Sequence, residues 1–193
     1  MKEKAVDRRV SRTKSMVLDA FLDLIIEKGY EKTTVQDIID RANIGRSTFY
    51  LHFTDKEHLL ECNIDQLQTF LLEQSHNEMP ASSHEPHRFG FSLAMLEHAQ
   101  SHIRLYKAIV RKQDGSTVIY HMHNMIVDLV SDEIGRIQTM SKQIPNETVI
   151  DFVANTFMLI LTWWMNHDIP CSALEADSIF HKLVFSGLGT LIG

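Results

Sequence analysis

Cysteine and proline are both scarce in this 193-residue sequence. Its two cysteines, Cys62 and Cys171, lie far apart and without CxxC spacing, which excludes a disulfide framework and a zinc knuckle. The prolines all fall between segments of helical apolar periodicity, at Pro80, Pro86, Pro145 and Pro170. Because helix breakers occur only at these boundaries, we expect helices throughout the chain and no strands.

Long apolar runs are missing as well. The opening MKEKAVDRR is followed by no apolar segment typical of a signal peptide, and no run approaches the ~18 to 20 uninterrupted apolar residues of a membrane span. We therefore expect a cytoplasmic protein without membrane contact.

Signatures of catalysis are also lacking. The sequence has no Ser/His/Asp or Cys/His arrangement with a local signature, and the closing GLGTLIG neither follows a strand nor opens a helix, as a nucleotide loop would. Histidine is plentiful, but only His98 and His102 share a helical face at i,i+4, and they lack a convincing third metal ligand. We predict that the protein is not an enzyme and has neither a cofactor nor a metal.

An excess of positive charge is absent, because the formal net charge is −6. The sum hides a segregation: residues 1–56 carry 11 Lys or Arg against 9 Asp or Glu, whereas residues 57–193 carry 8 against 16. Six basic side chains occur within residues 1–14, at Lys2, Lys4, Arg8, Arg9, Arg12 and Lys14. This pattern indicates a cationic arm before an acidic body, and a solvated, disordered tail is the alternative.

Apolar residues repeat with helical spacing in nine segments. We expect helices at 13–28, 34–42, 46–53, 55–74, 87–101, 103–111, 117–139, 147–166 and 174–191, with a linker at 76–86. Gly29 is placed to end the first helix, and Asp55 to cap the fourth. Thr34 and Asp37 have capping-box spacing at the start of the second helix, and Asn43–Gly45 forms the turn that follows it.

The stretch NIGRSTFYLHFTDK, at residues 43–56, is crowded with aromatic, small polar and basic residues. On a helix, Phe49 and Phe53 share one face, while Arg46, Ser47 and Tyr50 share another. One face then packs in a core, and the other offers short donors and acceptors to a groove about 12 Å wide. With the preceding helix and its three-residue turn, this predicts a helix-turn-helix that binds double-stranded DNA.

Two helix starts near this stretch are suited to phosphate. Thr33 and Thr34 begin the second helix and can bind phosphate through hydroxyl and backbone donors, although Thr34 is equally suited to be a cap. Lys56 begins the fourth helix, where its ammonium and the free N–H groups both favour an anion.

Residues 12–60 resemble the DNA-binding domain of the TetR family of bacterial transcriptional regulators. The resemblance lies in the run GYEKTTVQDIIDRANIGRSTFYLHFTDKEHLL. It implies an all-α fold, with a three-helix DNA-binding head at 1–56 joined by a long fourth helix to an effector-binding and dimerisation body at 57–193. The positions that resemble base-contacting residues are Arg46, Ser47 and Thr48. Those that resemble phosphate-contacting residues are Thr34, Tyr50, His52 and Lys56. Leu51 stands where relatives are often polar, which leaves contact with a thymine methyl.

The body has features of a dimer and a sensor. The segment 147–166 is apolar nearly all round, and the small residues Ser186, Gly187 and Gly189 would let another helix approach closely. We expect a homodimer through the last two helices, and an ordinary monomer core is the alternative. The segments FSLAMLEHAQSHIRLYKAIVRKQDGS and WWMNHDIP also resemble, more loosely, a C-terminal domain common in regulators of Gram-positive bacteria.

An effector pocket on the central helices would be lined by Phe91, Met95, His98, Tyr106, Met122, Met125 and Trp163, each of which also suits a core.

Together these features predict a sequence-specific transcriptional regulator that binds a palindromic operator. We expect a repressor that a small-molecule effector releases from DNA. The alternative is a DNA-binding coregulator whose body docks a protein partner instead.

Overall fold

The computed structural model describes residues 2–77, 89–111, 116–136 and 144–188, which form nine α-helices and no strand. The all-α prediction is confirmed. The helices are α1 (Lys2–Lys28), α2 (Val35–Ala42), α3 (Arg46–His52), α4 (Lys56–Asn77), α5 (Gly90–Ser101), α6 (Ile103–Arg111), α7 (Ser116–Arg136), α8 (Asn146–Asn166) and α9 (Ala173–Leu188). The expected linker at 76–86 lies almost entirely outside the described residues.

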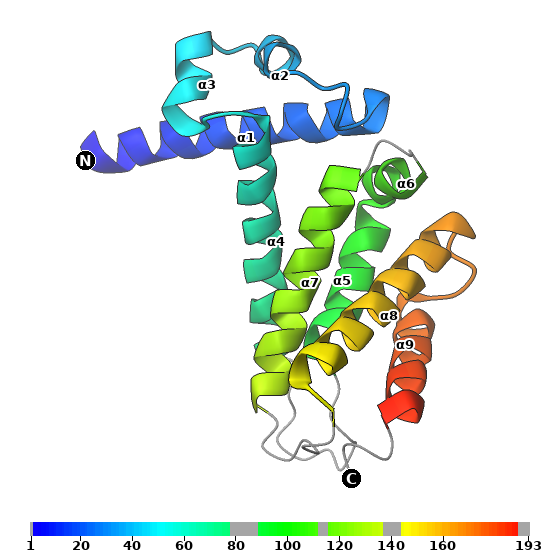
Figure 1. The fold of residues 1–193 in the computed structure, drawn as a ribbon. Helices are drawn as coiled ribbons and strands as arrows, with labels where there is room; N and C mark the ends of the chain where they lie inside the picture. The colour runs from blue at the N-terminus through cyan, green and yellow to red at the C-terminus, as the bar shows by residue number, and fades with distance from the viewer. Residues whose placement is uncertain (1, 78–88, 112–115, 137–143, 189–193) are drawn as a thin grey trace.

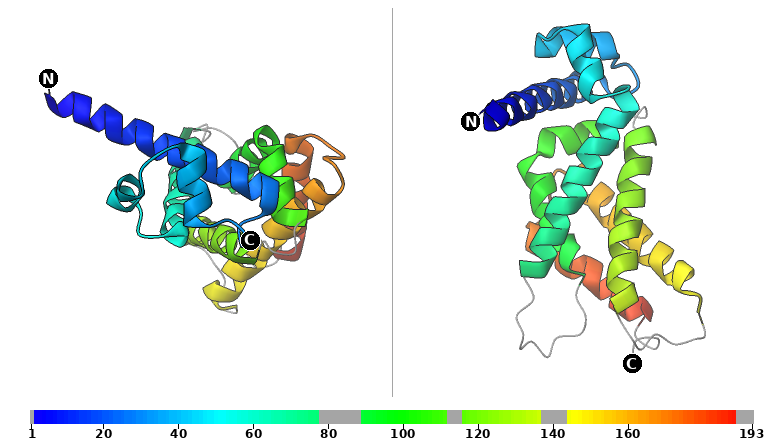
Figure 2. Two further views of the ribbon diagram at one scale, coloured as in Figure 1. Left: turned by 90° about the horizontal axis from the view of Figure 1, so that it is seen from above. Right: turned by 90° about the vertical axis from the view of Figure 1, so that its left-hand side faces the viewer.

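The first three helices form a head, and α4 descends from it into a body made with α5 to α9 (Figure 1). In the head, α1 lies across the top of the body and packs on both α2 and α6. In the body, α4 packs against α5 and α7, and α8 packs against α6, α7 and α9. Two further views show α2 and α3 on the side of α1 that faces away from the body (Figure 2).

Helix α1 is longer than its apolar periodicity predicts. It begins at Lys2, so the expected start at Thr13 was wrong, and the basic segment continues the helix. Arg12 and Lys14 are exposed on it, while the side chains of residues 2–9 lie outside what the structure describes. The helix ends as predicted, because Gly29 has φ 88°, a left-handed conformation that side chains disfavour.

Local hydrogen bonds fix the helix-turn-helix. The Asp37 N–H donates to Thr34 Oγ1 at 3.2 Å, and the Thr34 N–H donates to Asp37 Oδ2 at 2.7 Å, which confirms the capping box. The Lys28 ammonium, 2.7 Å from Asp37 Oδ2, and the Thr34 donors hold the pKa of that carboxyl well below its usual range. Asn43 takes φ 51° at the end of α2, so the predicted three-residue turn separates α2 from α3.

Helix α8 supplies the centre of the body. Val153, Phe157 and Trp164 are fully buried on it. By length and composition α8 is the one helix of the described residues that is apolar enough to cross a membrane. In the structure it packs among three helices of the body, and core helices of this kind often match the composition of a membrane span.

A buried polar cluster joins α9 to α5. Ser92 Oγ lies 2.5 Å from Asp177 Oδ1, and the Phe89 N–H donates to His181 Nε2 at 3.0 Å. His181 Nδ1 lies 2.9 Å from the Asp177 carbonyl oxygen. Because buried polar groups must keep their partners, this cluster fixes where α9 lies against the start of α5.

Candidate DNA-binding surface

Helix α3 is held by an apolar back. Phe49 is fully buried and Phe53, at the end of the helix, is 5% exposed; their ring centroids lie 5.7 Å apart. The Tyr50 ring meets the Phe49 ring edge-on at 5.4 Å. With these two phenylalanines in the core, the opposite side of α3 must face solvent.

That exposed α3 face consists of Arg46, Ser47, Tyr50 and Leu51. The Arg46 guanidinium lies 5.5 Å from the centre of the Tyr50 ring, a cation–π arrangement that keeps both groups at the surface. Leu51 is 76% exposed, the most exposed large apolar side chain of the described residues. An apolar side chain presented by a short helix in this way suits contact with a methyl group in a groove.

Gln36 of α2 was not among the predicted site residues, yet it lies beside the exposed α3 face. Arg46 Nη1 donates to Gln36 Oε1 at 3.5 Å, and Gln36 Nε2 donates to Asp40 Oδ1 at 2.8 Å. The sequence could have indicated Gln36, because it stands one position before Asp37 on the polar side of an amphipathic helix. Because Gln36 is exposed, a base edge or a phosphate could replace Arg46 or Asp40 as the hydrogen-bond partner of its amide.

The remaining predicted residues of α3 border this face. Thr48 and His52 are both half-buried, and the His52 ring lies 6.4 Å from the Phe53 ring. The helix therefore brings Arg46, Ser47 and Tyr50 together at the surface and places Thr48 and His52 at its edges.

The two threonines that begin α2 differ in environment. Thr34 is exposed, and its hydroxyl and N–H are both engaged in the capping box. Thr33 is 1% exposed, and its hydroxyl donates to the Gly29 carbonyl oxygen at 2.8 Å. The expectation that the Thr33 hydroxyl binds phosphate is therefore corrected, because the hydroxyl is buried and closes the turn after α1.

Lys56 is engaged within the head. Its Nζ donates to the Tyr30 carbonyl oxygen at 3.0 Å and lies 4.1 Å from the centre of the Tyr30 ring. Burial lowers the pKa of Lys56, and the charges of Glu31 and Glu57 oppose this shift. The Lys56 ammonium has three N–H donors, and the bond to Tyr30, which fastens α4 to the turn after α1, uses one of them. The other donors can bind a phosphate.

Most of the predicted effector residues lie in the core of the body. Five of them are at most 3% exposed: Phe91, Met95, Tyr106, Met122 and Met125. The other two, His98 and Trp163, are half-buried. The Tyr106 hydroxyl lies 3.0 Å from His98 Nδ1 and 4.0 Å from Met95 Sδ, so α5 and α6 bring three of these side chains together.

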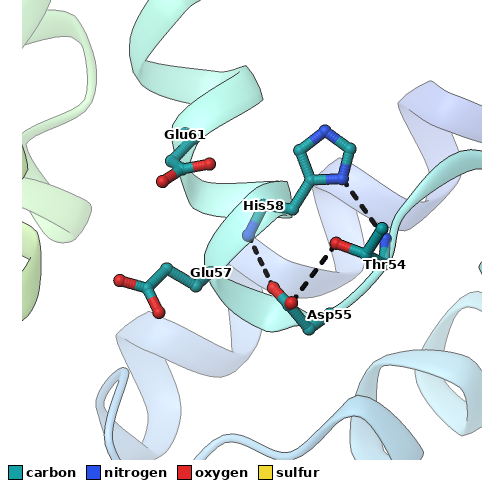
Figure 3. Close-up of a pocket in the computed structure, with 5 residues that line it drawn as sticks. All are labelled: Thr54, Asp55, Glu57, His58 and Glu61. Carbon is teal, nitrogen blue, oxygen red and sulfur yellow. Dashed lines mark hydrogen bonds between the residues drawn. The ribbon is translucent and has the colours of Figure 1, made fainter.

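A hollow open to solvent lies elsewhere, at the start of α4 (Figure 3). Its lining contains none of the predicted effector residues and consists of Thr54, Asp55, Glu57, His58 and Glu61. Asp55 Oδ1 accepts from the His58 N–H at 2.8 Å, which confirms Asp55 as the cap of α4 and lowers the pKa of its carboxyl. With three carboxylates in its lining, the hollow repels phosphate and attracts cations.

Two family profiles match this chain. One, described as bacterial regulatory proteins of the tetR family, covers residues 17–61, and the other, described as a transcriptional regulator C-terminal region, covers residues 88–186. The chain belongs to the TetR family of bacterial transcriptional regulators. The first profile spans most of the head, and the second spans most of the body.

Individual relatives support the assignment of this TetR-family chain. The HTH-type transcriptional regulator YxbF of Bacillus subtilis is 47% identical over 66 residues, which are 34% of this chain and 17% of YxbF. The match thus spans about a sixth of that relative. IcaR of Staphylococcus aureus, the HTH-type negative transcriptional regulator of the biofilm operon icaADBC, is 28% identical over 187 residues, which cover 93% of this chain and 98% of IcaR.

The fold also matches solved TetR-family structures. A transcriptional regulator from Syntrophomonas wolfei superposes with a TM-score of 0.71 at 19% identity, over 90% of this chain and 93% of that one. At this identity the similarity shows the fold alone.

Proposed function

We propose that this TetR-family regulator is a homodimeric repressor that reads a palindromic operator with the exposed α3 face and is released by a small effector bound in the body. The observation that carries the DNA-binding part is the position of that face. Helix α3, which carries that face, lies on the side of α1 away from the body, and Phe49 and Phe53 anchor its back in the core. Similarity to IcaR along the whole chain supports repression as the direction of control.

Within this proposal the residues have different roles. Arg46 reads guanine in the major groove, and Ser47 and Thr48 contact neighbouring base edges. Tyr50 and His52 hold phosphates, and Lys56 adds a phosphate contact to its structural role. Leu51 contacts a thymine methyl.

The experiment that tests DNA binding is a selection of genomic fragments by the purified protein, followed by titration at several salt concentrations. We expect Arg46→Ala to lose about 1 to 3 kcal/mol of discrimination between the selected sequence and a random one. Arg104→Ala is the matched control, because Arg104 is an exposed arginine of the body. A folded wild-type protein that retained no fragment at low salt would overturn the proposal.

Exposed apolar side chains on the last two helices support the homodimer. Phe152 and Leu159 of α8 are 41% and 63% exposed, and Leu174 and Leu183 of α9 are 59% and 48% exposed. Large apolar side chains exposed on two packed helices are typical of an interface, and a two-fold dimer also provides the two heads that a palindrome requires.

We expect Leu159→Glu to convert the dimer to a monomer, measured by light scattering after size exclusion. Leu51→Glu changes a leucine of the head that is even more exposed than Leu159, and it should leave the dimer intact. A monomeric wild-type protein at micromolar concentration would contradict this part of the proposal.

Effector binding requires space in a body whose candidate residues are packed. Three of them are methionines, whose flexible side chains can repack around an apolar ligand. An effector acts only if it binds the DNA-releasing form more tightly than the DNA-bound form.

The packing of Phe91, Met95 and Met122 also favours the second candidate, a coregulator whose body docks a protein. Screening apolar compounds by release of bound DNA separates the two. Release by a compound, abolished by Met122→Trp, would support the effector, whereas a stoichiometric protein partner and no releasing compound would support the coregulator.

A further inference from the structure

Three potential metal ligands converge where the head joins the body. Glu57 and Glu61 stand one turn apart on α4, and His121 faces them from α7. One ligand atom from each residue lies within 4.8 Å of the others. Figure 3 shows both carboxylates projecting to the same side of α4, away from His58. The group combines carboxylate and imidazole ligands from two helices, and is not a run of acidic residues along one helix.

The spacing of these atoms is that of an ion pair and is also wide enough for a shared metal ion. His121 Nε2 lies 3.6 Å from Glu57 Oε1, which exceeds hydrogen-bond length. Two ligands of one tetrahedral zinc ion, each about 2.1 Å from the metal, stand about 3.4 Å apart. Glu61 is exposed, so rotation about its side-chain bonds can bring its carboxylate within the same range.

The electrostatic environment favours a cation. Like charges at i and i+4 on a helix repel each other, as Glu57 and Glu61 must. Burial, and then the charges of Glu57, Glu31, Asp55 and Glu61, raise the pKa of Tyr30 to about 12, so four carboxylates act on this region. The ammonium of Lys56, which begins α4, is fastened to Tyr30.

We propose that Glu57, Glu61 and His121 form a binding site for a divalent transition metal, and that zinc is the ion that fits best. The imidazole argues against magnesium and calcium, which prefer oxygen ligands throughout. Three protein ligands leave a fourth position, which water fills from the open hollow beside Glu57 and Glu61. This inference replaces the expectation of no metal, which was made because His98 and His102 lack a convincing third ligand in the sequence.

The position of the site links the metal to the head. The Thr117 hydroxyl donates to Glu31 at 2.8 Å, so α7 already contacts the head beside the site. A bound ion joins α7 to the first turns of α4, which is separated from the end of α3 by three residues. Zinc therefore fastens the start of α4, the helix that follows directly on the head, to α7 of the body. This role goes beyond the proposed release by a small effector.

Cobalt and zinc titrations of the chelator-treated full-length protein test the proposal. We expect one Co²⁺ per protomer with visible absorption bands, and displacement of those bands by Zn²⁺. His121→Gln should weaken Co²⁺ binding by about a hundredfold or more, because losing a ligand costs at least as much as losing a group that orients one. Matched controls are His123→Gln, from the same helix, and Glu73→Gln, from α4; both should bind as the wild type does.

Thermal unfolding of the same samples tests whether the metal links α4 to α7. Zinc should raise the Tm of the wild type and of both controls, and leave the Tm of His121→Gln unchanged. Glu61→Gln is a second variant, for the case in which His121→Gln does not fold. Because Glu61 is exposed, this substitution should keep the fold, and it should also abolish the zinc-dependent rise in Tm.

Two results would overturn the proposal. One is an equal Co²⁺ affinity in the wild type, Glu61→Gln and His121→Gln. The other is a band that disappears in His102→Gln and persists in His121→Gln, which would place the ion on His98 and His102.

Discussion

Protonation of His98 should destabilise the body, and its surroundings explain why. The imidazole is half-buried on α5, stacks on His102 with ring centroids 4.3 Å apart, and has its Nδ1 3.0 Å from the Tyr106 hydroxyl. Burial, and then the charge of His102, lower the pKa of His98 from 6.5 to about 4. The Tyr106 hydroxyl has one proton, and imidazole nitrogen is a better acceptor than the Met95 sulfur. We therefore assign a neutral His98 that accepts at Nδ1.

The sign and size of the effect follow from this lowered pKa. The unfolded chain binds the proton more tightly than the folded protein, so the free energy of unfolding falls as pH drops from 6.5 towards about 4. Between about pH 7.5 and about pH 5.5, linkage gives a loss of at most about 1.4 kcal/mol, and solvent screening of a partly exposed ring halves this to about 0.7 kcal/mol. Well above pH 6.5, His98 is neutral in both states and no longer makes the free energy of unfolding depend on pH.

Urea unfolding at these two pH values, at one protein concentration, measures the loss. Other carboxylates and histidines titrate as well, so the diagnostic quantity is the difference between wild type and His98→Gln. We expect the variant to lose about 0.7 to 1.4 kcal/mol less than the wild type on acidification. His167→Gln, which changes an exposed histidine at the end of α8, should match the wild type. An equal loss in His98→Gln and wild type would refute the reasoning.

Three further substitutions test the head. Thr34→Ala removes the cap of α2 and should lower the free energy of unfolding by about 1 kcal/mol, whereas Thr33→Val removes the buried donor to the Gly29 carbonyl and should cost about 1 to 3 kcal/mol. Wild-type stability in either variant, measured by urea unfolding, would contradict the hydrogen bonds described. Lys56→Met loses the hydrogen bond to Tyr30 and the contact with its ring, at a cost of about 1 to 2 kcal/mol. In operator titrations the same variant should lower the slope of log affinity against log salt by about one per half-site, and an unchanged slope would remove Lys56 from the phosphate contacts.

Residues close in sequence produced the accurate predictions. The capping box of Thr34 and Asp37, the left-handed Gly29 and the Asp55 cap each depend on backbone groups within four residues. The pairing of Phe49 with Phe53 depends on helical periodicity in the same way. The predicted start of α1 was wrong because the basic segment before Thr13 has no apolar periodicity. A helix needs no apolar face where it projects beyond the core, and α1 therefore extends back to Lys2.

The sequence by itself therefore determined the all-α class, the helix-turn-helix and the exposed side of α3, because these follow from hydrogen bonds and periodicity within a few turns of chain. Only the tertiary structure decided which polar groups meet. Lys56 reaches Tyr30, and His121 faces Glu57 across 64 residues of chain. Such pairings depend on the angles at which helices pack, and those angles are set by the whole core.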